Sequence, residues 1–268
     1  MARFLFSALH PPDGDKAFGG VATWIKTLSD ALTRRGHECV SWGPRLARPA
    51  GRFDVGVISN LKHTAEALGW CDRLLNVSHG AVEDERPSDT LPVAFTSEEL
   101  REFWIGIGSI IRQPIDLTYW APPEKEIQRK TLLFYSYRSS SSIGLDGLAE
   151  RLGLEFGWLK NCSADRARSE MQRAALVCAS GRAALEAMAC GAATMICDWR
   201  GYQRPLYVSS YKDAMTHNYS GRGGVDPAHC DLSADAKARM KYGSRRAWVE
   251  KYHDAEKITD QLLECLQF

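Results

Sequence analysis

The sequence lacks the features that mark membrane, disulfide-rich secreted and strongly basic nucleic-acid-binding proteins. Its 34 Lys and Arg residues balance 33 Asp and Glu residues, so a net charge of +1 gives no strong field for anionic partners. No apolar run approaches the length of a membrane span, and the short apolar N-terminus does not fit a signal peptide. The eight cysteines include no C-x-x-C pair and indicate reduced core residues without a metal site. We therefore expect a cytoplasmic protein with no integral membrane segment.

The sequence also has no internal repeat. An alternation of strand-like and helical patterns begins near residue 3 and begins again near residue 132. A chain of 268 residues can form two small domains. Continuous apolar runs separated by helical patterns are typical of parallel sheets that are covered on both faces. The proline-rich, charged residues 118–130 have no apolar period and are expected to be a linker. The expected strands are residues 3–9, 38–42, 54–59, 73–77, 91–96 and 110–112 before the linker, and 132–137, 154–159, 175–179 and 193–197 after it.

Residues 174–198 are the most informative segment. Two buried strands flank a turn at Ser180-Gly181 and a helix that begins at Arg182. This turn is expected to present free backbone N–H groups at a helix N-terminus, which suits an anion such as pyrophosphate. Glu186 is the only carboxylate of the helix and lies about one turn from that end.

The residues Gly-Arg-Ala-Ala-Leu-Glu-Ala-Met-Ala-Cys-Gly at 181–191 resemble the donor-site signature of GT-B glycosyltransferases of the GT4 type (glycosyl transferases group 1). The Gly-Gly pair, helix and Arg-Gly-His within residues 19–40 are similar to the N-terminal element of that family. The resemblance implies an α/β GT-B fold, with two Rossmann-like α/β/α domains facing across a cleft. Those domains would be residues 1–117 and 131–246, with a C-terminal helix at about 247–268 crossing back onto the first. The alternative is a generic Rossmann-like helix with Glu186 solvated at its surface.

The resemblance also implies roles for particular residues. Glu186 would bind the ribose, and His79, at the end of a strand, would lie near the transferred sugar, unless it merely caps a turn. Arg138 would neutralise the departing phosphates, although a surface ion pair is the alternative for it. The catalytic candidates are therefore His79 and Arg138. The donor-binding candidates are Gly19, Gly20, Arg138, Ser139, Ser140, Ser180, Gly181, Arg182 and Glu186; Gly19-Gly20 can also be a simple tight turn.

Two positions depart from the family pattern. Ile143 and Gly144 stand where a phosphate-binding lysine is usual, and Cys178 stands eight residues before Glu186, where many members have a first glutamate. The serine loop can substitute for the lysine, but the missing pair also favours a second hypothesis. In that hypothesis the chain is a GT-B-like module that binds a nucleotide sugar without catalysis.

The first hypothesis is a glycosyltransferase that moves a sugar from a UDP- or GDP-linked donor to a hydroxyl acceptor. The resemblance implies a retaining, metal-independent reaction without a cofactor. The acceptor is left open among soluble glycans, small molecules, proteins and a hydroxylated base in nucleic acid, and the oligomeric state is open too. A basic C-terminal stretch could dock an acceptor or form a solvated helix face; its residues are Lys237, Arg239, Lys241, Arg245, Arg246 and Lys251.

Overall fold

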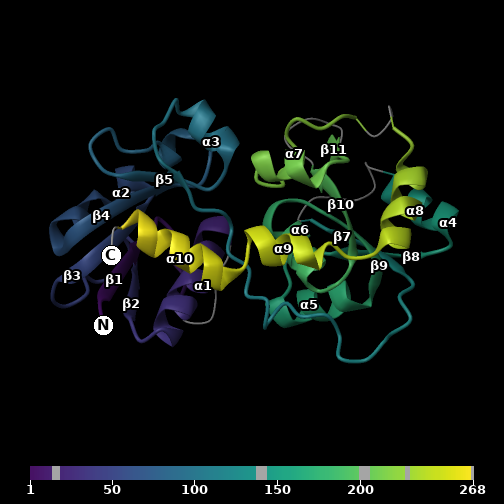
Figure 1. The fold of residues 1–268 in the computed structure, drawn as a ribbon, viewed down its shortest axis with the longest axis horizontal. Coiled ribbons are helices and arrows are strands. Elements are labelled where there is room, and N and C mark those ends of the chain that lie inside the picture. Colours follow the sequence, from purple (N-terminus) through teal and green to yellow (C-terminus); the bar gives the residue numbers. More distant parts are fainter. Residues whose placement is uncertain (14–18, 137–143, 199–205, 227–229, 267–268) are drawn as a thin grey trace. The chain divides into compact units, whose positions relative to one another are not determined.

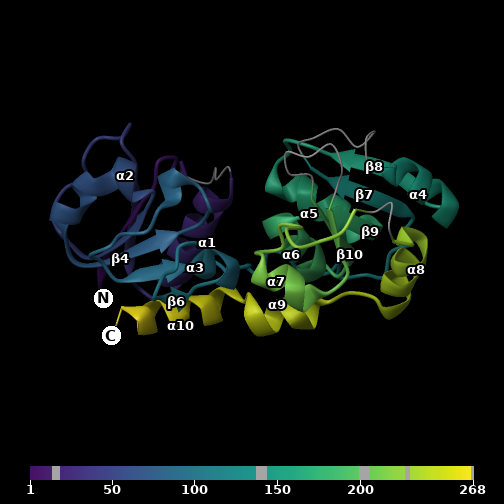
Figure 2. The ribbon, with the colours of Figure 1, turned by 90° about the horizontal axis from the view of Figure 1, so that it is seen from above.

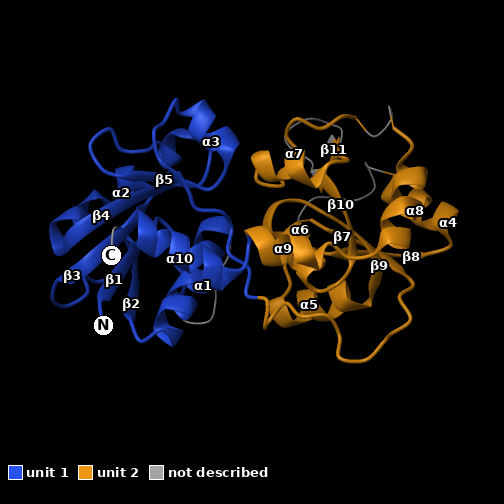
Figure 3. Cartoon of the chain, viewed as in Figure 1, with its two compact units in different colours: residues 1–116, 253–268 blue, residues 117–252 orange. Residues whose placement is uncertain are grey.

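The computed structural model describes residues 1–13, 19–136, 144–198, 206–226 and 230–266 (Figure 1). The chain forms two compact units (Figure 3): unit 1 comprises Met1–Asp116 and His253–Phe268, and unit 2 comprises Leu117–Tyr252. The expected linker, residues 118–130, is part of unit 2. All eight cysteines are free thiols.

Unit 1 contains a parallel six-stranded sheet in the order β2-β1-β3-β4-β5-β6. The strands are β1 (Arg3–Ser7), β2 (Glu38–Trp42), β3 (Phe53–Ser59), β4 (Cys71–Ser78), β5 (Val93–Phe95) and β6 (Ser109–Ile110). The helices are α1 (Gly20–Arg34), α2 (Leu61–Thr64), α3 (Glu98–Phe103) and α10 (Ala255–Cys265), with 3₁₀ turns η1 (Ala65–Trp70) and η2 (Glu83–Glu85).

Helix α10 completes the core of unit 1 from the far end of the sequence. Ile258 and Leu262 of α10 are buried in one apolar cluster with Trp24 and Leu28 of α1 and the central strands. The two helices lie side by side (Figure 1). At their edge Arg35 forms ion pairs with acidic residues of α10. The apolar period of α1 therefore packs on both a sheet and a returning helix.

Unit 2 contains a five-stranded sheet in the order β11-β10-β9-β7-β8, in which only β11 is antiparallel to its neighbour among the strands described. Its strands are β7 (Thr131–Tyr135), β8 (Glu155–Leu159), β9 (Ala174–Ala179), β10 (Ala193–Asp198) and β11 (Leu206–Val208). Helices α4 (Leu145–Leu152) and α8 (Leu232–Tyr242) cover one face, and α5 (Ala164–Arg173), α6 (Gly181–Ala189) and α9 (Arg246–Tyr252) lie on the other (Figure 2).

Two expectations about the C-terminal third were wrong. The expected long polar loop after residue 198 contains β11 and the short helix α7 (Tyr211–Thr216). The expected continuous helix at 247–268 is divided into α9 and α10, because Asp254 leaves the helical conformation and caps α10 by accepting a hydrogen bond from Glu256 N–H. Gly243, with φ +70°, separates α8 from α9 in the same way. The division places α9 in unit 2 and α10 in unit 1.

Helix α3 ends with an unusual residue in the left-handed conformation. Ile105 has φ +51°, and its N–H donates to the carbonyl of Glu102, while Gly106 N–H donates to the carbonyl of Arg101. These two bonds form a Schellman motif, in which glycine is the common residue at the position that Ile105 occupies. A β-branched side chain is strained there.

We expect Ile105→Gly to raise the free energy of unfolding by about 1 kcal/mol, because it removes this strain. Chemical denaturation measures the effect. Ile107→Gly is the matched control: Ile107 is equally exposed but has no positive φ, so the added glycine entropy should lower stability. An Ile105→Gly protein as unstable as the control would contradict the argument.

Candidate functional site

The carboxyl ends of β7 and β9 define the edge of the unit 2 sheet at which the expected donor residues begin. Tyr135, the last residue of β7, is paired in register with Ala179, the last residue of β9. The segments that follow both strands therefore start side by side, as in the ligand-binding edge of open α/β sheets. Arg138, Ser139 and Ser140, expected just after β7, lie outside the described residues.

The turn at Ser180-Gly181 differs from the expectation of free backbone amides. Gly181 has φ +58°, which explains its glycine, and its N–H donates to the carbonyl of Tyr219 at 2.5 Å. Tyr219 is fully buried and itself adopts φ +54°. The chain after α7 therefore satisfies the first amide of α6, and anion binding at this turn depends on the side chains and remaining amides.

Glu186 is a buried carboxylate and not the solvated surface residue of the alternative interpretation. Only 8% of the residue is exposed. Its Oε1 accepts a hydrogen bond of 2.7 Å from Arg182 Nε, one helical turn earlier, in an ion pair. Burial raises the pKa of Glu186, and the Arg182 guanidinium opposes that rise. Keeping a carboxylate here costs free energy that packing alone does not explain.

Two tyrosines that the sequence reasoning missed lie within electrostatic range of Glu186. Burial, followed by the Glu186 charge, raises the pKa of Tyr135. Burial and a hydrogen bond of 2.8 Å from its hydroxyl to Asp165 raise the pKa of Tyr119 to about 12, and Glu186 adds to the effect. Both phenols are therefore protonated donors at neutral pH. Tyr135 could have been found as a polar residue ending a central strand, whereas Tyr119 lies in the segment taken for a linker.

The edge of the unit 1 sheet holds His79, directly after β4. Its Nε2 shares a hydrogen bond of 3.0 Å with the hydroxyl of Ser59, at the end of the neighbouring β3, and its ring meets Trp24 edge-on at 5.0 Å. Its Nδ1 is buried and has no hydrogen-bond partner within the described part of the chain. Burial lowers the pKa of His79 to about 3, so the ring is neutral at physiological pH.

A carboxylate that the sequence reasoning did not single out lies beside His79. Glu85 accepts hydrogen bonds from the side chain of Asn60 at 2.6 Å and from the backbone N–H of His79 at 3.3 Å. Burial raises the pKa of Glu85, and these bonds oppose the rise. Asn60 adopts φ +51° and also accepts a hydrogen bond from Leu9 N–H, so the loops after β1, β3 and β4 are joined at this edge.

The lowered pKa of His79, a half-buried residue whose Nδ1 is fully buried, predicts a pH-dependent stability. Because the folded pKa lies near 3 and the ordinary value is 6.5, the unfolded chain binds the proton first as the pH falls. The wild type should therefore lose about 2 kcal/mol from this group between about pH 7 and pH 5. His79→Gln, which keeps a polar partner for Ser59, should lose about 2 kcal/mol less over that interval in urea titrations. Parallel pH profiles for the two proteins would contradict the burial.

The expected glycine pair begins α1 in unit 1. Gly19 has φ +87° and its carbonyl accepts hydrogen bonds from the backbone N–H and the hydroxyl of Thr23. Gly20 is the first residue of α1, and both glycines are exposed with open space around them. Across the described ranges, no three His, Cys, Asp or Glu side chains are arranged to hold a metal ion.

The basic stretch of α8 and α9 is not one solvated face, because two of its arginines are structural. Arg239 is buried and donates to Asp235 and to the carbonyls of Thr194 and Ser209. Arg246 donates to the carbonyls of Leu117, Trp120 and Ala189, joining α9 to the first residues of unit 2 and to the end of α6.

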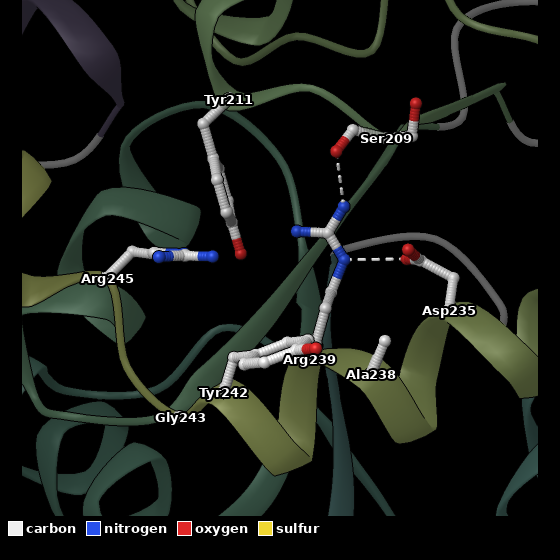
Figure 4. A pocket seen from close by; sticks show the side chains of 8 residues that line it. All are labelled: Ser209, Tyr211, Asp235, Ala238, Arg239, Tyr242, Gly243 and Arg245. Atoms are coloured by element: carbon white, nitrogen blue, oxygen red, sulfur yellow. Dashed lines mark hydrogen bonds and ion pairs between the residues drawn. The ribbon is translucent and has the colours of Figure 1, made fainter.

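A cavity of about 170 Å³ lies beside Arg239 (Figure 4). The ring of Tyr211 stands between the guanidinium groups of Arg239 and Arg245, at 4.7 and 5.9 Å from its centre. The cavity contains none of the expected donor residues; it is lined by Ser209, Tyr211, Asp235, Ala238, Arg239, Tyr242, Gly243 and Arg245.

Comparison with known proteins supports the fold. No family model and no curated protein matches the sequence. Among solved structures, sucrose-phosphate synthase from Thermosynechococcus elongatus superposes over 98% of this chain and 98% of its own, with a TM-score of 0.57 and 11% sequence identity. The expected GT-B class, with two Rossmann-like α/β units, is confirmed by this likeness, which at such identity concerns the fold alone. No described helix is both long and apolar enough to cross a bilayer.

Proposed function

We propose that the protein is a glycosyltransferase that moves a sugar from a nucleoside-diphosphate donor, UDP- or GDP-linked, to a hydroxyl acceptor. The observation that carries the proposal is buried Glu186, one turn into α6, at the carboxyl edge of a parallel sheet in a GT-B fold. The GT4-like signature around it gives the carboxylate a reason to be buried there. Charge complementarity to two ribose hydroxyls offsets its desolvation when donor is bound.

In this proposal the donor lies against the carboxyl edge of unit 2. Glu186 accepts hydrogen bonds from the ribose hydroxyls, with Arg182 holding it in place. Arg138 and the hydroxyls of Ser139 and Ser140 neutralise the pyrophosphate, since a departing diphosphate gains negative charge as the bond to the sugar breaks. Ser180 and Gly181 are proposed to contact the same phosphates, and the family resemblance gives Gly19 and Gly20 a donor-binding role as well.

His79 is proposed to lie near the anomeric carbon as a neutral group. A histidine with a pKa near 3 does not take up a proton at neutral pH, so it acts by hydrogen bonding through Nδ1 and not as a general base. In the proposed retaining reaction the bond between the sugar and the β-phosphate breaks and the acceptor oxygen bonds to the same carbon. The acceptor proton then passes to a phosphate oxygen of the leaving diphosphate, and neither a metal nor a cofactor takes part.

The test is a panel of UDP-, GDP- and dTDP-sugars scored first by thermal shift and then by release of nucleoside diphosphate. A donor at about 100 times its Kd should stabilise the protein by about 2.7 kcal/mol. Slow release of diphosphate in the absence of acceptor is the expected sign of an enzyme. If no nucleotide sugar raises the melting temperature, the donor-site assignment fails.

The second candidate is a binding module without catalysis. It is favoured by Cys178, which occupies the place of the family's first glutamate and is fully buried within β9. For this candidate a nucleotide sugar raises the melting temperature, but no diphosphate is released with any acceptor mixture. The two readouts together separate the candidates.

A further inference from the structure

Unit 1 carries an exposed apolar finger, which we define as residues 103–107 at the end of α3. Phe103, Ile105 and Ile107 are 56%, 93% and 98% exposed. Isolated apolar residues at a surface are ordinary, but three in five residues form a patch of the kind that marks interaction sites. None of the three contributes to a core cluster of the described structure.

The backbone of the finger is built to hold these side chains outward. A side chain at Gly106 or Gly108 would collide with the ring of Phe95 or the backbone of Val93, so these glycines lie tightly against β5. The indole N–H of Trp104 donates to the carbonyl of Gly80 at 3.2 Å and fixes the finger to the loop after β4. Because Gly106 and Gly108 lie against β5 and Trp104 is held by its hydrogen bond, the side chains of Ile105 and Ile107 between them point into solvent. The strained backbone of Ile105 does not bring its exposed side chain into any core cluster of unit 1. Backbone strain of this kind is concentrated at functional surfaces.

The charges beside the finger indicate a basic partner. The segments next to it, residues 83–86 and 98–102, contain six carboxylates and two arginines. Lys62 and Arg112, which pair with Asp84 and Glu98, bring the positive charges to four, so an excess of negative charge remains. The side chain of Glu102 is exposed next to Phe103 and forms no ion pair within the described ranges. An anionic bilayer would repel this surface, whereas a protein surface with arginine or lysine around an apolar cavity would complement it.

A surface of this kind lies around the cavity beside Arg239 in unit 2, whose lining combines the rings of Tyr211 and Tyr242 with charged side chains. Helices α8 and α9 with the turn between them carry six Lys and Arg residues against two carboxylates. The cavity presents the rings of Tyr211 and Tyr242, and Tyr242 is 68% exposed (Figure 4). Arg245 at its rim is exposed; its guanidinium lies 5.9 Å from the centre of the Tyr211 ring and has no hydrogen bond or ion pair with any described residue. A volume of about 170 Å³ accommodates one isoleucine side chain.

We propose that the apolar finger of one copy docks into this cavity in unit 2 of a second copy. Ile107 fills the space between Tyr211 and Tyr242, and Glu102 pairs with Arg245. The contact joins two different surfaces, so each copy offers both a finger and a cavity. Burial of the isoleucines supplies affinity, and the opposite charges fix the orientation. The proposal concerns assembly and does not depend on the proposed transferase activity.

Sedimentation velocity over a protein concentration series is the first test. The wild type is expected to self-associate as concentration rises, and Ile107→Ser to weaken the association at least tenfold. Ile105→Gly should weaken it too while raising the melting temperature, so loss of association cannot be attributed to misfolding. Leu46→Ser is the matched control, because Leu46 is an exposed apolar residue of unit 1 outside the finger. Wild type that stays monomeric, or equal weakening by Leu46→Ser, overturns the proposal.

Charge reversal tests the partner surface. Glu102→Lys and Arg245→Glu should each weaken self-association at least fivefold, and an equimolar mixture of the two variants should associate better than either alone. The last experiment measures binding of the wild type and of Ile107→Ser to vesicles of neutral and of anionic lipid. Binding to vesicles that Ile107→Ser abolishes, without self-association of the wild type, would assign the finger to a membrane and overturn the proposal. A mixture no stronger than the single variants would do the same.

Discussion

Glu186→Gln is expected to lower kcat/KM for the nucleotide-sugar donor by about 100-fold, mainly through a higher KM. Two hydroxyl hydrogen bonds to a carboxylate are weakened when it becomes an amide, and bonds to charged groups contribute about 1.5–3 kcal/mol each. Ribose contacts are made equally in the ground and transition states, so kcat should change little. Steady-state release of diphosphate measures both constants.

Glutamine has the size of Glu186, and its amide oxygen can still accept the hydrogen bond from Arg182 Nε. The Arg182 guanidinium loses its counter-charge, so the variant should be less stable, and a melting curve checks that it is folded under the assay conditions. Glu150→Gln in α4 is the matched control, since Glu150 is an exposed carboxylate on another helix of unit 2. Unchanged KM in a folded Glu186→Gln protein would remove Glu186 from the ribose site. It would leave the buried Arg182 pair as a purely structural feature.

Arg239→Met is expected to lower the free energy of unfolding of unit 2 by about 3–5 kcal/mol. The arginine donates to Asp235, to the hydroxyl of Tyr207 and to two backbone carbonyls at the β10-β11 edge, and it lies over the ring of Tyr211. Methionine preserves much of the volume but removes all of these hydrogen bonds. Asp235 and the carbonyl of Thr194 then keep the hydroxyls of Tyr207 and Tyr211 as donors, and the carbonyl of Ser209 loses this donor. Uncompensated buried polar groups carry a penalty of this size.

Lys237→Met, two residues earlier on α8, is the matched control because Lys237 is exposed. It should change the unfolding free energy by less than about 0.5 kcal/mol. Urea unfolding followed by tryptophan fluorescence provides the comparison. If the two methionine variants unfold at the same urea concentration, the hydrogen bonds of Arg239 do not stabilise the sheet edge.

The sequence predicted the strands well where periodicity reports directly on burial. The apolar run before Ser180 is β9, a strand without any polar residue, as is typical of strands covered on both faces. The run before His79 is β4, which was found from Leu74, Leu75 and Val77 although it also contains polar residues. Strand β11 was missed because it is only three residues long and follows a polar segment. The break between α9 and α10 was missed because it depends on tertiary contacts of His253 with Gln113 and of Ile115 with Ala255, far away in sequence.

The candidate site was predictable in part. Glu186 followed from a local motif, but its burial and its Arg182 partner depend on how α6 packs. Folding brings Tyr119 near Glu186 and Glu85 next to His79. The residues adjacent to Tyr119 and Glu85 in the sequence form no motif that would have marked them as site residues. The backbone N–H of Gly181, expected to be free, donates a hydrogen bond to the carbonyl of Tyr219. No local sequence pattern predicted the left-handed conformation of Tyr219 that allows this bond.

The return of the chain to unit 1 has a consequence for synthesis on the ribosome. Unit 2 is one continuous stretch, Leu117–Tyr252, whereas unit 1 is completed only by Ile258 and Leu262 of α10. The nascent chain therefore leaves part of the apolar face of α1, with Trp24 and Leu28, uncovered until α10 has been synthesised. Unit 2 can therefore fold before unit 1, although most of unit 1 is synthesised earlier. We expect chaperones that recognise apolar segments to bind unit 1 during this interval.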